Sequence, residues 1–514
     1  MRDDEVANLI KFKRVSEEDL QRQRDLCIEN KALWGRGKQF YISTFGCQLN
    51  ENDSEKVGGL LTEMGLTKTD DIQKADIILI NTCSIRENAA GRFYGNLGEL
   101  KAMKRNNPNL IVGVCGCMMK QEIYVERVKR SYRFVDIMFG PSDIWRLPEI
   151  LNRRLRGSRR VYDISNDELI AEDQPILRER KYRALVSIMF GCNNFCTFCV
   201  VPHTRGRERS RNMDDIVHEV EDLVKEGYSE VMLLGQNVDS YGKEIREYRK
   251  AYPNAFAELV KRCAQTGIKR LRFMTSHPKD ISLELLDVMQ AYPNVERHLH
   301  LPLQSGSDKV LKAMNRHYNI ERYMMIVDEA RKRIPDLKFS TDIIVGFPGE
   351  EEADFEQTLA IMEKVRYATS YTFQYSPRPN TPAALEEQIP QEIVDERFQR
   401  LVNMQNEHSL EIAQAQVGRI CEVLIEGVSD HVDDRYTGRS SDNFLINFSV
   451  PDSIWPGRLI NQPASFKGDY LEGKFCKVRI TEAKTFSLTG EYVSGLELES
   501  DDELDHSSLN IAEA

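Results

Sequence analysis

Three cysteines stand close together in the segment GCNNFCTFC, which spans residues 191–199. Their spacing, C-x3-C-x2-C, places Cys192, Cys196 and Cys199 in one short loop. Three thiolates can bind three irons of a 4Fe-4S cluster and leave the fourth iron open to an external ligand. Zinc is the alternative, but structural zinc takes four closed ligands, and the loop offers no fourth one at a zinc spacing. The loop therefore favours an iron–sulfur cluster.

Three further cysteines, Cys47, Cys83 and Cys117, each follow a short β-branched apolar run. The runs QFYISTFGC, ADIILINTC and NLIVGVCGC recur about every 35 residues, the length of one strand–helix repeat. Carboxyl ends of parallel strands meet at one sheet edge, so these thiols can converge on a second cluster. Three buried structural thiols are the alternative. Strand alternation points Cys115 to a side face and leaves Cys117 in the turn, which favours Cys117 as the ligand.

The segments around these cysteines predict an α/β protein with three folded regions. The first is predicted to be an open parallel sheet, flavodoxin- or Rossmann-like, with helices between its strands. Six apolar strands separated by helices then predict a partial (β/α)6 TIM-like barrel rather than a closed eightfold one. Short alternating strands at the end predict a small antiparallel β-barrel, OB-like in shape. The six barrel strands are expected at 184–190, 230–235, 270–275, 297–303, 338–346 and 367–375.

Shifts in composition predict the domain boundaries. They divide the chain into an N-terminal extension (1–35), a cysteine-bearing domain (36–152), a polar linker (153–177), a barrel core (178–410), a small β-barrel (411–496) and an acidic, unstructured tail (497–514).

The charge balance argues against a protein that binds nucleic acid through overall basicity. The chain has 70 Lys and Arg against 81 Asp and Glu, a formal net charge of −11. The tail carries seven of the acids and no Lys or Arg, so most of the acidity lies there, and RNA binding must rest on local patches. No apolar run is long enough for a membrane helix, and the first 35 residues do not resemble a leader. We therefore expect a cytoplasmic protein with no membrane partner, whose clustered cysteines are ligands rather than disulfides.

The cysteine loop resembles that of the radical S-adenosylmethionine (SAM) superfamily, which has this spacing and an aromatic residue before the third cysteine. The resemblance covers the six strand–helix units, whose turns LLGQN, TSHP, LQSGS, MNRHY, TDIIVG and GFPGE are similar to family motifs. It implies a SAM site at the barrel mouth, with ordinary loop hydrogen bonding as the alternative for each turn. The residues so implied are Phe198, Gly235, Gln236, Asn237, Ser276, Gln304, Ser305, Arg316, Asp342, Gly346 and Gly349.

The N-terminal segments narrow the resemblance to the methylthiotransferase family, which combines a three-cysteine domain, a radical-SAM core and a C-terminal TRAM barrel. Five segments are similar to its MiaB-type tRNA enzymes: TFGCQLNENDSE, NTCSIREN, CVVPHTRGRERSR, HLPLQSGSDKVLKAMNR and YSPRPNTPAA. The resemblance implies that all six cysteines are catalytic. Cys192, Cys196 and Cys199 would hold the SAM cluster, and Cys47, Cys83 and Cys117 a sulfur-delivering auxiliary 4Fe-4S cluster.

The implied reaction adds a methylthio group to C2 of N6-(dimethylallyl)adenosine at position 37 of tRNA, next to the anticodon. Because the adenine C2–H bond has no usable acidity, a radical must open it, and SAM would be both radical source and methyl donor. The implied partners are the tRNA anticodon stem-loop, an electron donor such as flavodoxin or ferredoxin, and an iron–sulfur carrier, with the protein a monomer. Two alternatives stay open: the same chemistry on threonylcarbamoyl adenosine in tRNA or on a ribosomal protein, and a non-catalytic, metal-containing RNA-binding protein.

RNA contacts are expected at two places. The first is TRGRERSR, directly after the cysteine loop, where internal salt bridges are the alternative. The second is a stacking and phosphate surface on the TRAM-like barrel. The candidates are Arg205, Arg207, Arg209, Arg211, Arg435, Tyr436, Arg439 and Phe444. The aromatic side chains Tyr367, Tyr371, Phe373 and Tyr375 are expected in the core rather than on a base-stacking shelf.

Overall fold

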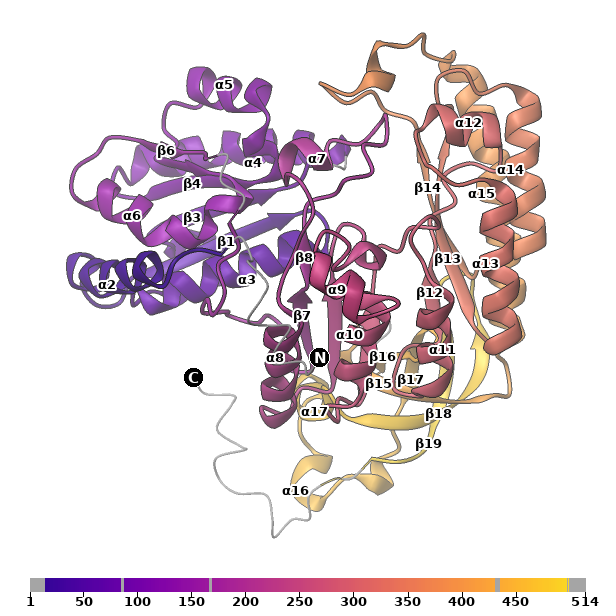
Figure 1. The fold of residues 1–514 in the computed structure, drawn as a ribbon. Coiled ribbons are helices and arrows are strands. Elements are labelled where there is room, and N and C mark those ends of the chain that lie inside the picture. Colours follow the sequence, from indigo (N-terminus) through magenta and orange to yellow (C-terminus); the bar gives the residue numbers. More distant parts are fainter. Residues whose placement is uncertain (1–13, 85–86, 166–168, 430–434, 497, 499–514) are drawn as a thin grey trace.

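The computed structural model describes residues 14–84, 87–165, 169–429, 435–496 and 498 (Figure 1). Within these ranges, the helices are all too short or too polar to cross a membrane. Residues 1–13 of the expected N-terminal extension, and all of the expected acidic tail except Leu498, lie outside the described residues.

The N-terminal region is a parallel sheet with helices on both faces (Figure 1). Its strands are β1 (Gln39–Phe45), β2 (Thr67–Lys68), β3 (Ile77–Thr82), β4 (Ile111–Gly116), β5 (Ile137–Phe139) and β6 (Val161–Asp163), paired in the order β2-β1-β3-β4-β5-β6. Its helices are α2 (Glu17–Trp34), α3 (Gln48–Glu63), α4 (Glu87–Asn106), α5 (Glu122–Ser131) and α6 (Leu147–Leu155), with 3-10 turns η1 (Ile72–Lys74), η2 (Cys117–Lys120) and η3 (Pro141–Arg146). One apolar core joins the sheet to α2, α3 and α6, and a second joins it to α4 and α5. Strands β3 and β4 are buried along their whole length because both faces are covered.

The central region is a partial barrel of six parallel strands with helices outside, as predicted. Its strands are β7 (Arg183–Ser187), β10 (Glu230–Leu234), β11 (Arg270–Phe273), β12 (His298–His300), β13 (Lys338–Val345) and β14 (Thr369–Gln374). They form the sheets β7-β10-β11 and β12-β13-β14, which a bridge between Leu271 and Val295 joins. The outer layer consists mainly of α8 (Met213–Lys225), α10 (Ala255–Ala264), α11 (Leu283–Ala291), α13 (Ile320–Arg333), α14 (Glu352–Val365) and α15 (Gln391–Gln414). Shorter elements are β8 (Met189–Phe190), α7 (Val201–Thr204), β9 (Arg209–Ser210), η4 (Val238–Ser240), α9 (Arg246–Ala251), α12 (Asp308–Ala313) and η5 (Pro382–Leu385).

The C-terminal region is a small closed β-barrel. Its strands are β15 (Ile420–Val428), β16 (Tyr436–Ser440), β17 (Leu445–Ser449), β18 (Phe475–Ala483) and β19 (Leu488–Ser494), in the order β15-β16-β17-β19-β18. The pairs are antiparallel as predicted, except that β17 and β19 run parallel. The long segment between β17 and β18 holds η6 (Asp452–Ile454), α16 (Gly457–Ile460) and α17 (Ala464–Leu471).

The partial barrel contacts both other regions, at different ends. Near the carboxyl end of β7, Lys56 Nζ of α3 donates to Ser187 Oγ at 3.0 Å. The β-barrel instead packs against the amino ends of β10 and β11. Arg270 and Arg272 of β11 make hydrogen bonds to it. The Arg270 Nη1 atom donates to the Arg439 carbonyl at 2.7 Å, and Arg272 Nη2 to the Ser440 carbonyl at 2.9 Å. The yellow barrel accordingly lies below the magenta strands in Figure 1.

Candidate functional site

The first cysteine triad lies at the carboxyl ends of neighbouring strands of the N-terminal sheet. Cys47 caps α3 after β1, Cys83 follows β3, and Cys117 opens η2 after β4. The Asn50 Oδ1 atom is 3.8 Å from both the Cys47 and the Cys117 Sγ atoms. A hydrogen bond with Cys83 and the charge of Arg205 lower the pKa of Cys47 to about 6, against the cost of burial. The sheet order β1-β3-β4 thus brings these three thiols to one place.

The geometry distinguishes Cys117 from its neighbour Cys115. Cys115 packs into the apolar core on one face of the sheet, and this burial raises the pKa of its thiol strongly. The chain then turns at Gly116, whose φ is +97° and where a Cβ atom would lie 2.4 Å from Asn81 Oδ1. This glycine turn directs Cys117 away from the core that holds Cys115. The Cys117 Sγ atom accepts a hydrogen bond from Arg205 Nε at 3.2 Å, which favours Cys117 as the cluster ligand.

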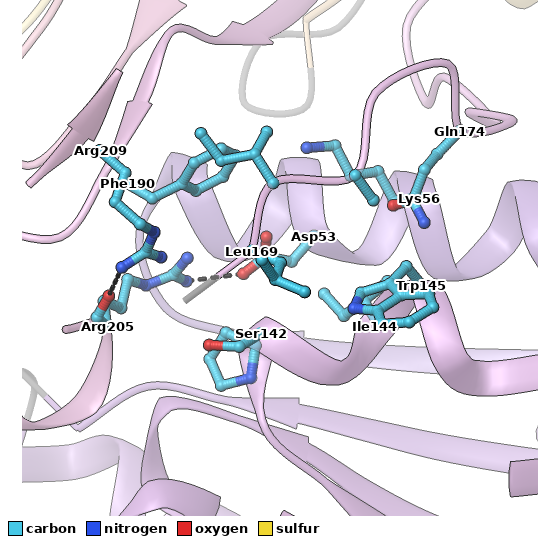
Figure 2. Close-up of a pocket in the computed structure, with 13 residues that line it drawn as sticks. Asp53, Lys56, Ser142, Ile144, Trp145, Leu169, Gln174, Phe190, Arg205 and Arg209 are labelled. Atoms are coloured by element: carbon cyan, nitrogen blue, oxygen red, sulfur yellow. Dashed lines mark hydrogen bonds and ion pairs between the residues drawn. The ribbon is translucent and has the colours of Figure 1, made fainter. Parts of the chain in front are cut away.

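Arg205 is not on an RNA-facing surface, where the sequence analysis predicted it. Its side chain follows α7 and is buried against the N-terminal domain, with its residue only 5% exposed. Besides Cys117, its guanidinium donates through Nη2 to Asn50 Oδ1 at 2.9 Å and to Asp53 Oδ2 at 2.6 Å. Figure 2 shows this ion pair beside a pocket of about 50 Å³ between the two domains. A buried guanidinium with three protein partners cannot hold an RNA phosphate, so that prediction is wrong for Arg205.

Two of the other three arginines of this segment also bind protein groups. Arg209 is buried, and its Nη1 atom donates to the carbonyls of Arg205 and Arg207, the first of which is drawn in Figure 2. Arg211 forms ion pairs with Glu172 and Glu219, both at 2.8 Å. Only Arg207 of the four is exposed, with its guanidinium 4.3 Å from the centre of the Phe195 ring. The alternative of internal salt bridges therefore describes most of this segment.

The second triad lies in the loop after β8, at the barrel mouth. Gly191 begins the loop with a φ of +76°, and a Cβ atom there would lie 2.1 Å from the Arg207 carbonyl oxygen. Thr197 ties the loop to the end of α12 through its N–H, which donates to the Met314 carbonyl at 3.1 Å. Burial raises the pKa of Cys192 to about 11 and that of Cys199 to about 12. The Cys196 Sγ atom accepts a hydrogen bond from Arg316 Nη1 at 3.3 Å.

The barrel mouth presents buried polar atoms that lack a partner among the described residues. They are Gln236 Oε1 and Asn237 Oδ1, directly after β10, and Ser276 Oγ, after β11. Buried polar atoms are normally hydrogen-bonded, so these three fit a polar ligand such as the methionyl group of SAM. Nearby, Phe198 packs edge-on against Phe347 at 6.3 Å between ring centres, in the GFPGE turn.

The remaining residues implied in SAM binding are placed around the same mouth. Gly235 directly follows β10, and Gln304, with a φ of +65°, pairs with β13. The Asp342 carboxylate lies 3.6 Å from His300 Nε2. Ser305 is buried, and Gly346 and Gly349 both take positive φ values in the GFPGE turn.

The candidate RNA surface of the β-barrel is not a shared exposed face. Tyr436 is buried in the barrel core against Phe448 and Trp455, so its assignment to base stacking is wrong. The Arg439 guanidinium pairs with Glu426 at 3.3 Å, and its carbonyl accepts from Arg270. Phe444 is half-buried against the barrel core, and Arg435 is half-buried beside the chain that leads into β16.

Comparisons with known proteins show the family to which the chain belongs. The radical SAM superfamily matches residues 186–362, the uncharacterized protein family UPF0004 matches 39–140, and the TRAM domain matches 414–493. The tRNA-2-methylthio-N(6)-dimethylallyladenosine synthase of Acetivibrio thermocellus is 46% identical over 489 residues, which cover 93% of this chain and 97% of that protein. The chain belongs to this synthase family. The synthase from Alkaliphilus oremlandii is 45% identical over 484 residues, covering 93% and 98%.

The synthase family membership confirms the predicted resemblance to radical-SAM methylthiotransferases. Among solved structures, the radical S-adenosylmethionine methyltransferase TsrM of Kitasatospora setae aligns with a TM-score of 0.48 and 13% identity, over 68% of this chain and 74% of that one.

The donor set in this member of the synthase family fits the 4Fe-4S cluster of the radical SAM superfamily. Among the described residues, no three Cys, His, Asp or Glu side chains are grouped closely enough to hold one metal ion. Each triad consists of three cysteine thiols, the ligand set that can hold three irons of a 4Fe-4S cluster and leave the fourth iron open.

Two features of this synthase family member were missed by the sequence analysis. A pocket of about 650 Å³ beside the cysteine loop is lined by the cationic side chains Lys279, Lys312, Arg316 and Arg322 and by His317, against one acid, Asp308. The basic residues of MNRHYNIER were its only local signal. On β14, Tyr371 and Phe373 are each 47% exposed, which corrects their assignment to the core, whereas Tyr367 is fully buried.

Proposed function

We propose that this chain transfers a methylthio group to C2 of N6-(dimethylallyl)adenosine at position 37 of tRNA, using two 4Fe-4S clusters and SAM. The observation that carries the proposal is the pair of cysteine triads in two adjoining domains: one lies at the carboxyl ends of β1, β3 and β4, and the other in the loop after β8. Arg205 joins them, because it follows the second triad in the chain and hydrogen-bonds Cys117 of the first. The names of relatives that are 45–46% identical over nearly the whole chain support the same reaction.

The loaded triads would supply reductive cleavage of SAM at one site and a sulfur source at the other. The chain's own residues hold and orient the reactants. Gln236, Asn237 and Ser276 offer unpaired polar atoms to the methionyl group of SAM. Phe198 and Phe347 form an apolar wall beside the cysteine loop, which limits the access of water to a radical.

Tyr371 and Phe373 are suited to hold the target base. They share one face of β14, and their register partners on β13 are Asp342 and Ile344. Ile344 belongs to the same apolar cluster as Phe198, so this strand face looks toward the cysteine loop. Exposed aromatic rings stack nucleobases that have left a base stack, which is how proteins reach atoms such as adenine C2. The two rings thus offer a stacking surface near the proposed SAM site.

Nucleoside mass spectrometry on tRNA from cells that lack the protein tests the proposal. We expect the 2-methylthio derivative of N6-(dimethylallyl)adenosine to disappear and the unmethylthiolated nucleoside to accumulate. In reconstituted protein, Cys192→Ala should abolish the release of 5′-deoxyadenosine from SAM. Cys83→Ala should retain that release and lose the methylthio product, because it removes only a ligand of the auxiliary site.

Cys421→Ala is the matched control, since this half-buried thiol lies in the C-terminal barrel, far in the chain from either triad. It should retain both activities. Persistence of the methylthio nucleoside in the deletion strain would overturn the acceptor and favour threonylcarbamoyl adenosine or a ribosomal protein. Bound zinc, without 5′-deoxyadenosine release, would favour the non-catalytic alternative.

A further inference from the structure

Each cysteine triad has one buried arginine that donates a hydrogen bond to one of its sulfur atoms. Arg205 Nε lies 3.2 Å from Cys117 Sγ, and Arg316 Nη1 lies 3.3 Å from Cys196 Sγ. Both arginine residues are about 95% buried. Both come from the central domain, one after α7 and one after α12. The N-terminal domain thus supplies three thiols, while the central domain supplies the cation beside them.

The two arginines differ in how their charge is balanced. Arg205 is paired with Asp53 at 2.6 Å, and both side chains are at most 5% exposed. Arg316 has no carboxylate partner among the described residues; its second contact is the Tyr318 hydroxyl at 3.5 Å. Burial makes such charges act strongly on a neighbouring group, because little water screens them. The auxiliary thiols therefore face an ion pair, whereas the SAM triad faces an unbalanced cation.

We propose that Arg205 is a positioning residue of the auxiliary site: it holds Cys117 by an N–H···S hydrogen bond and, together with Asp53, sets the reduction potential of the cluster bound there. The proposal rests on the proposed function only in assigning a 4Fe-4S cluster to Cys47, Cys83 and Cys117. Hydrogen bonds to ligand sulfur and nearby positive charge stabilise the reduced, more negative cluster over the oxidised one. Asp53 opposes this effect through its own charge and fixes the guanidinium in place.

Substitutions at the two residues should therefore shift the potential in opposite directions. Arg205→Gln removes the positive charge and should make the one-electron potential of the auxiliary cluster more negative. Asp53→Asn removes the negative charge and should make it more positive, since the guanidinium keeps its contacts with Asn50 and Cys117. Arg205→Lys retains the charge but cannot reach all three partners with one ammonium group, so its shift should be smaller than that of Arg205→Gln.

The test uses the full-length chain with Cys192, Cys196 and Cys199 changed to alanine, so that only the auxiliary cluster assembles. Dithionite titration followed by electron paramagnetic resonance gives the potential, and iron and sulfide analysis gives the cluster content. Arg316→Gln in this background is the matched control: it removes an equally buried arginine from the other triad and should leave the auxiliary potential unchanged.

Shifts of opposite sign at Arg205 and Asp53 support the proposal. Shifts of the same sign, or none at either residue, would overturn it and reduce Arg205 to a packing residue between the domains. If Arg205→Gln fails to retain a cluster, Arg205→Lys and Asp53→Asn still decide the sign. These potentials are measured without RNA, so a failure here is distinct from a failure of the nucleoside experiment above.

Discussion

Asp239 is a buried carboxyl group at the mouth of the barrel, beside the residues that face the proposed SAM site. It lies in η4, directly after β10, and its Oδ2 atom accepts a hydrogen bond from the His277 N–H at 2.8 Å. Burial raises the pKa of Asp239 to about 7, with the Asp280 carboxylate adding to the rise and Lys243 opposing it. The folded protein therefore keeps this group protonated at pH values where the unfolded chain ionises it.

Asp239→Asn should remove a pH-dependent contribution to stability. The pKa of Asp239 in the folded protein lies above the ordinary value of 3.8. Between these two pKa values the folded state binds more protons than the unfolded state, so the stability that this group contributes is lost as the pH rises. The free energy of unfolding of the wild type relative to the variant should fall by up to about 4 kcal/mol between about pH 4 and about pH 7, then level off. Urea unfolding of both proteins between about pH 5 and about pH 8 measures the upper part of this change. A difference that rises with pH would contradict burial as the cause.

Some residues of the candidate site could be predicted from a short stretch of sequence, whereas others depend on contacts with distant parts of the chain. The six cysteines could be found because loop spacing and recurrence after apolar runs are properties of short segments. Arg205 was assigned to phosphate because nothing in TRGRERSR shows that α7 lies against η2 and directs this side chain to Cys117. Tyr436 was misassigned for the same reason. Its partners in the barrel core are Phe448 in β17 and Trp455 beyond that strand, and nothing in its own segment shows these contacts.

Helix α3 connects the auxiliary site to the polar linker. Cys47 caps its first turn, and the linker crosses its middle, where the Leu177 N–H donates to the Glu55 carbonyl at 2.9 Å. At Gly59 a Cβ atom would lie 2.1 Å from the Pro175 carbonyl oxygen, which is backbone and cannot swing aside. The glycine thus permits the linker to pack directly on the helix that positions Cys47.

Gly59→Ala should destabilise the N-terminal domain by roughly 1–3 kcal/mol, because the added methyl group displaces the linker. Gly95→Ala is the matched control: Gly95 also lies in a helix of this domain, α4, but its Cβ would meet nothing within 4 Å. There the same substitution should stabilise by roughly 0.5–1 kcal/mol through helix propensity alone. Hydrogen exchange of α3 peptides across a urea series measures both, and equal effects at the two sites would rule out the linker contact as the cause.

The elements themselves were predictable where a segment shows strong apolar periodicity. The strands of the parallel sheets appear as β-branched runs, since sheets covered on both faces leave no polar alternation. Strand β16 (YTGRS) has no such apolar run, and at its Gly438 a Cβ would lie 2.3 Å from the Leu424 carbonyl. The parallel pairing of β17 with β19 depends on barrel closure, which no local segment encodes.

On the scale of the whole molecule, the C-terminal barrel and the cysteine triads lie at opposite ends of the central barrel. The docking contact is a buried charge network: Arg272 pairs with Glu230 at 2.7 Å and Glu296 at 3.0 Å, and also donates to the Asn443 side chain and the Ser440 carbonyl. This contact occupies the chain beside Arg439 and Phe444, two of the residues that were expected to bind RNA. For the tRNA substrate proposed above, the cationic side chains available near the cysteine loop are Arg207 and those of the mouth itself.

The 650 Å³ basic pocket beside the cysteine loop presents the cationic side chains of the mouth in a chain of net charge −11. Changing Lys312 and Arg322 together to Gln should weaken tRNA binding roughly tenfold at moderate salt, because two cations that can neutralise phosphates are lost. The slope of log affinity against log salt should become shallower by about 1–2. Lys332→Gln is the control: it lies on the same helix as Arg322, is highly exposed, and is not among the residues that line the pocket. Filter binding across a salt series measures both quantities, and equal losses in the two proteins would show that the pocket makes no particular contact with RNA.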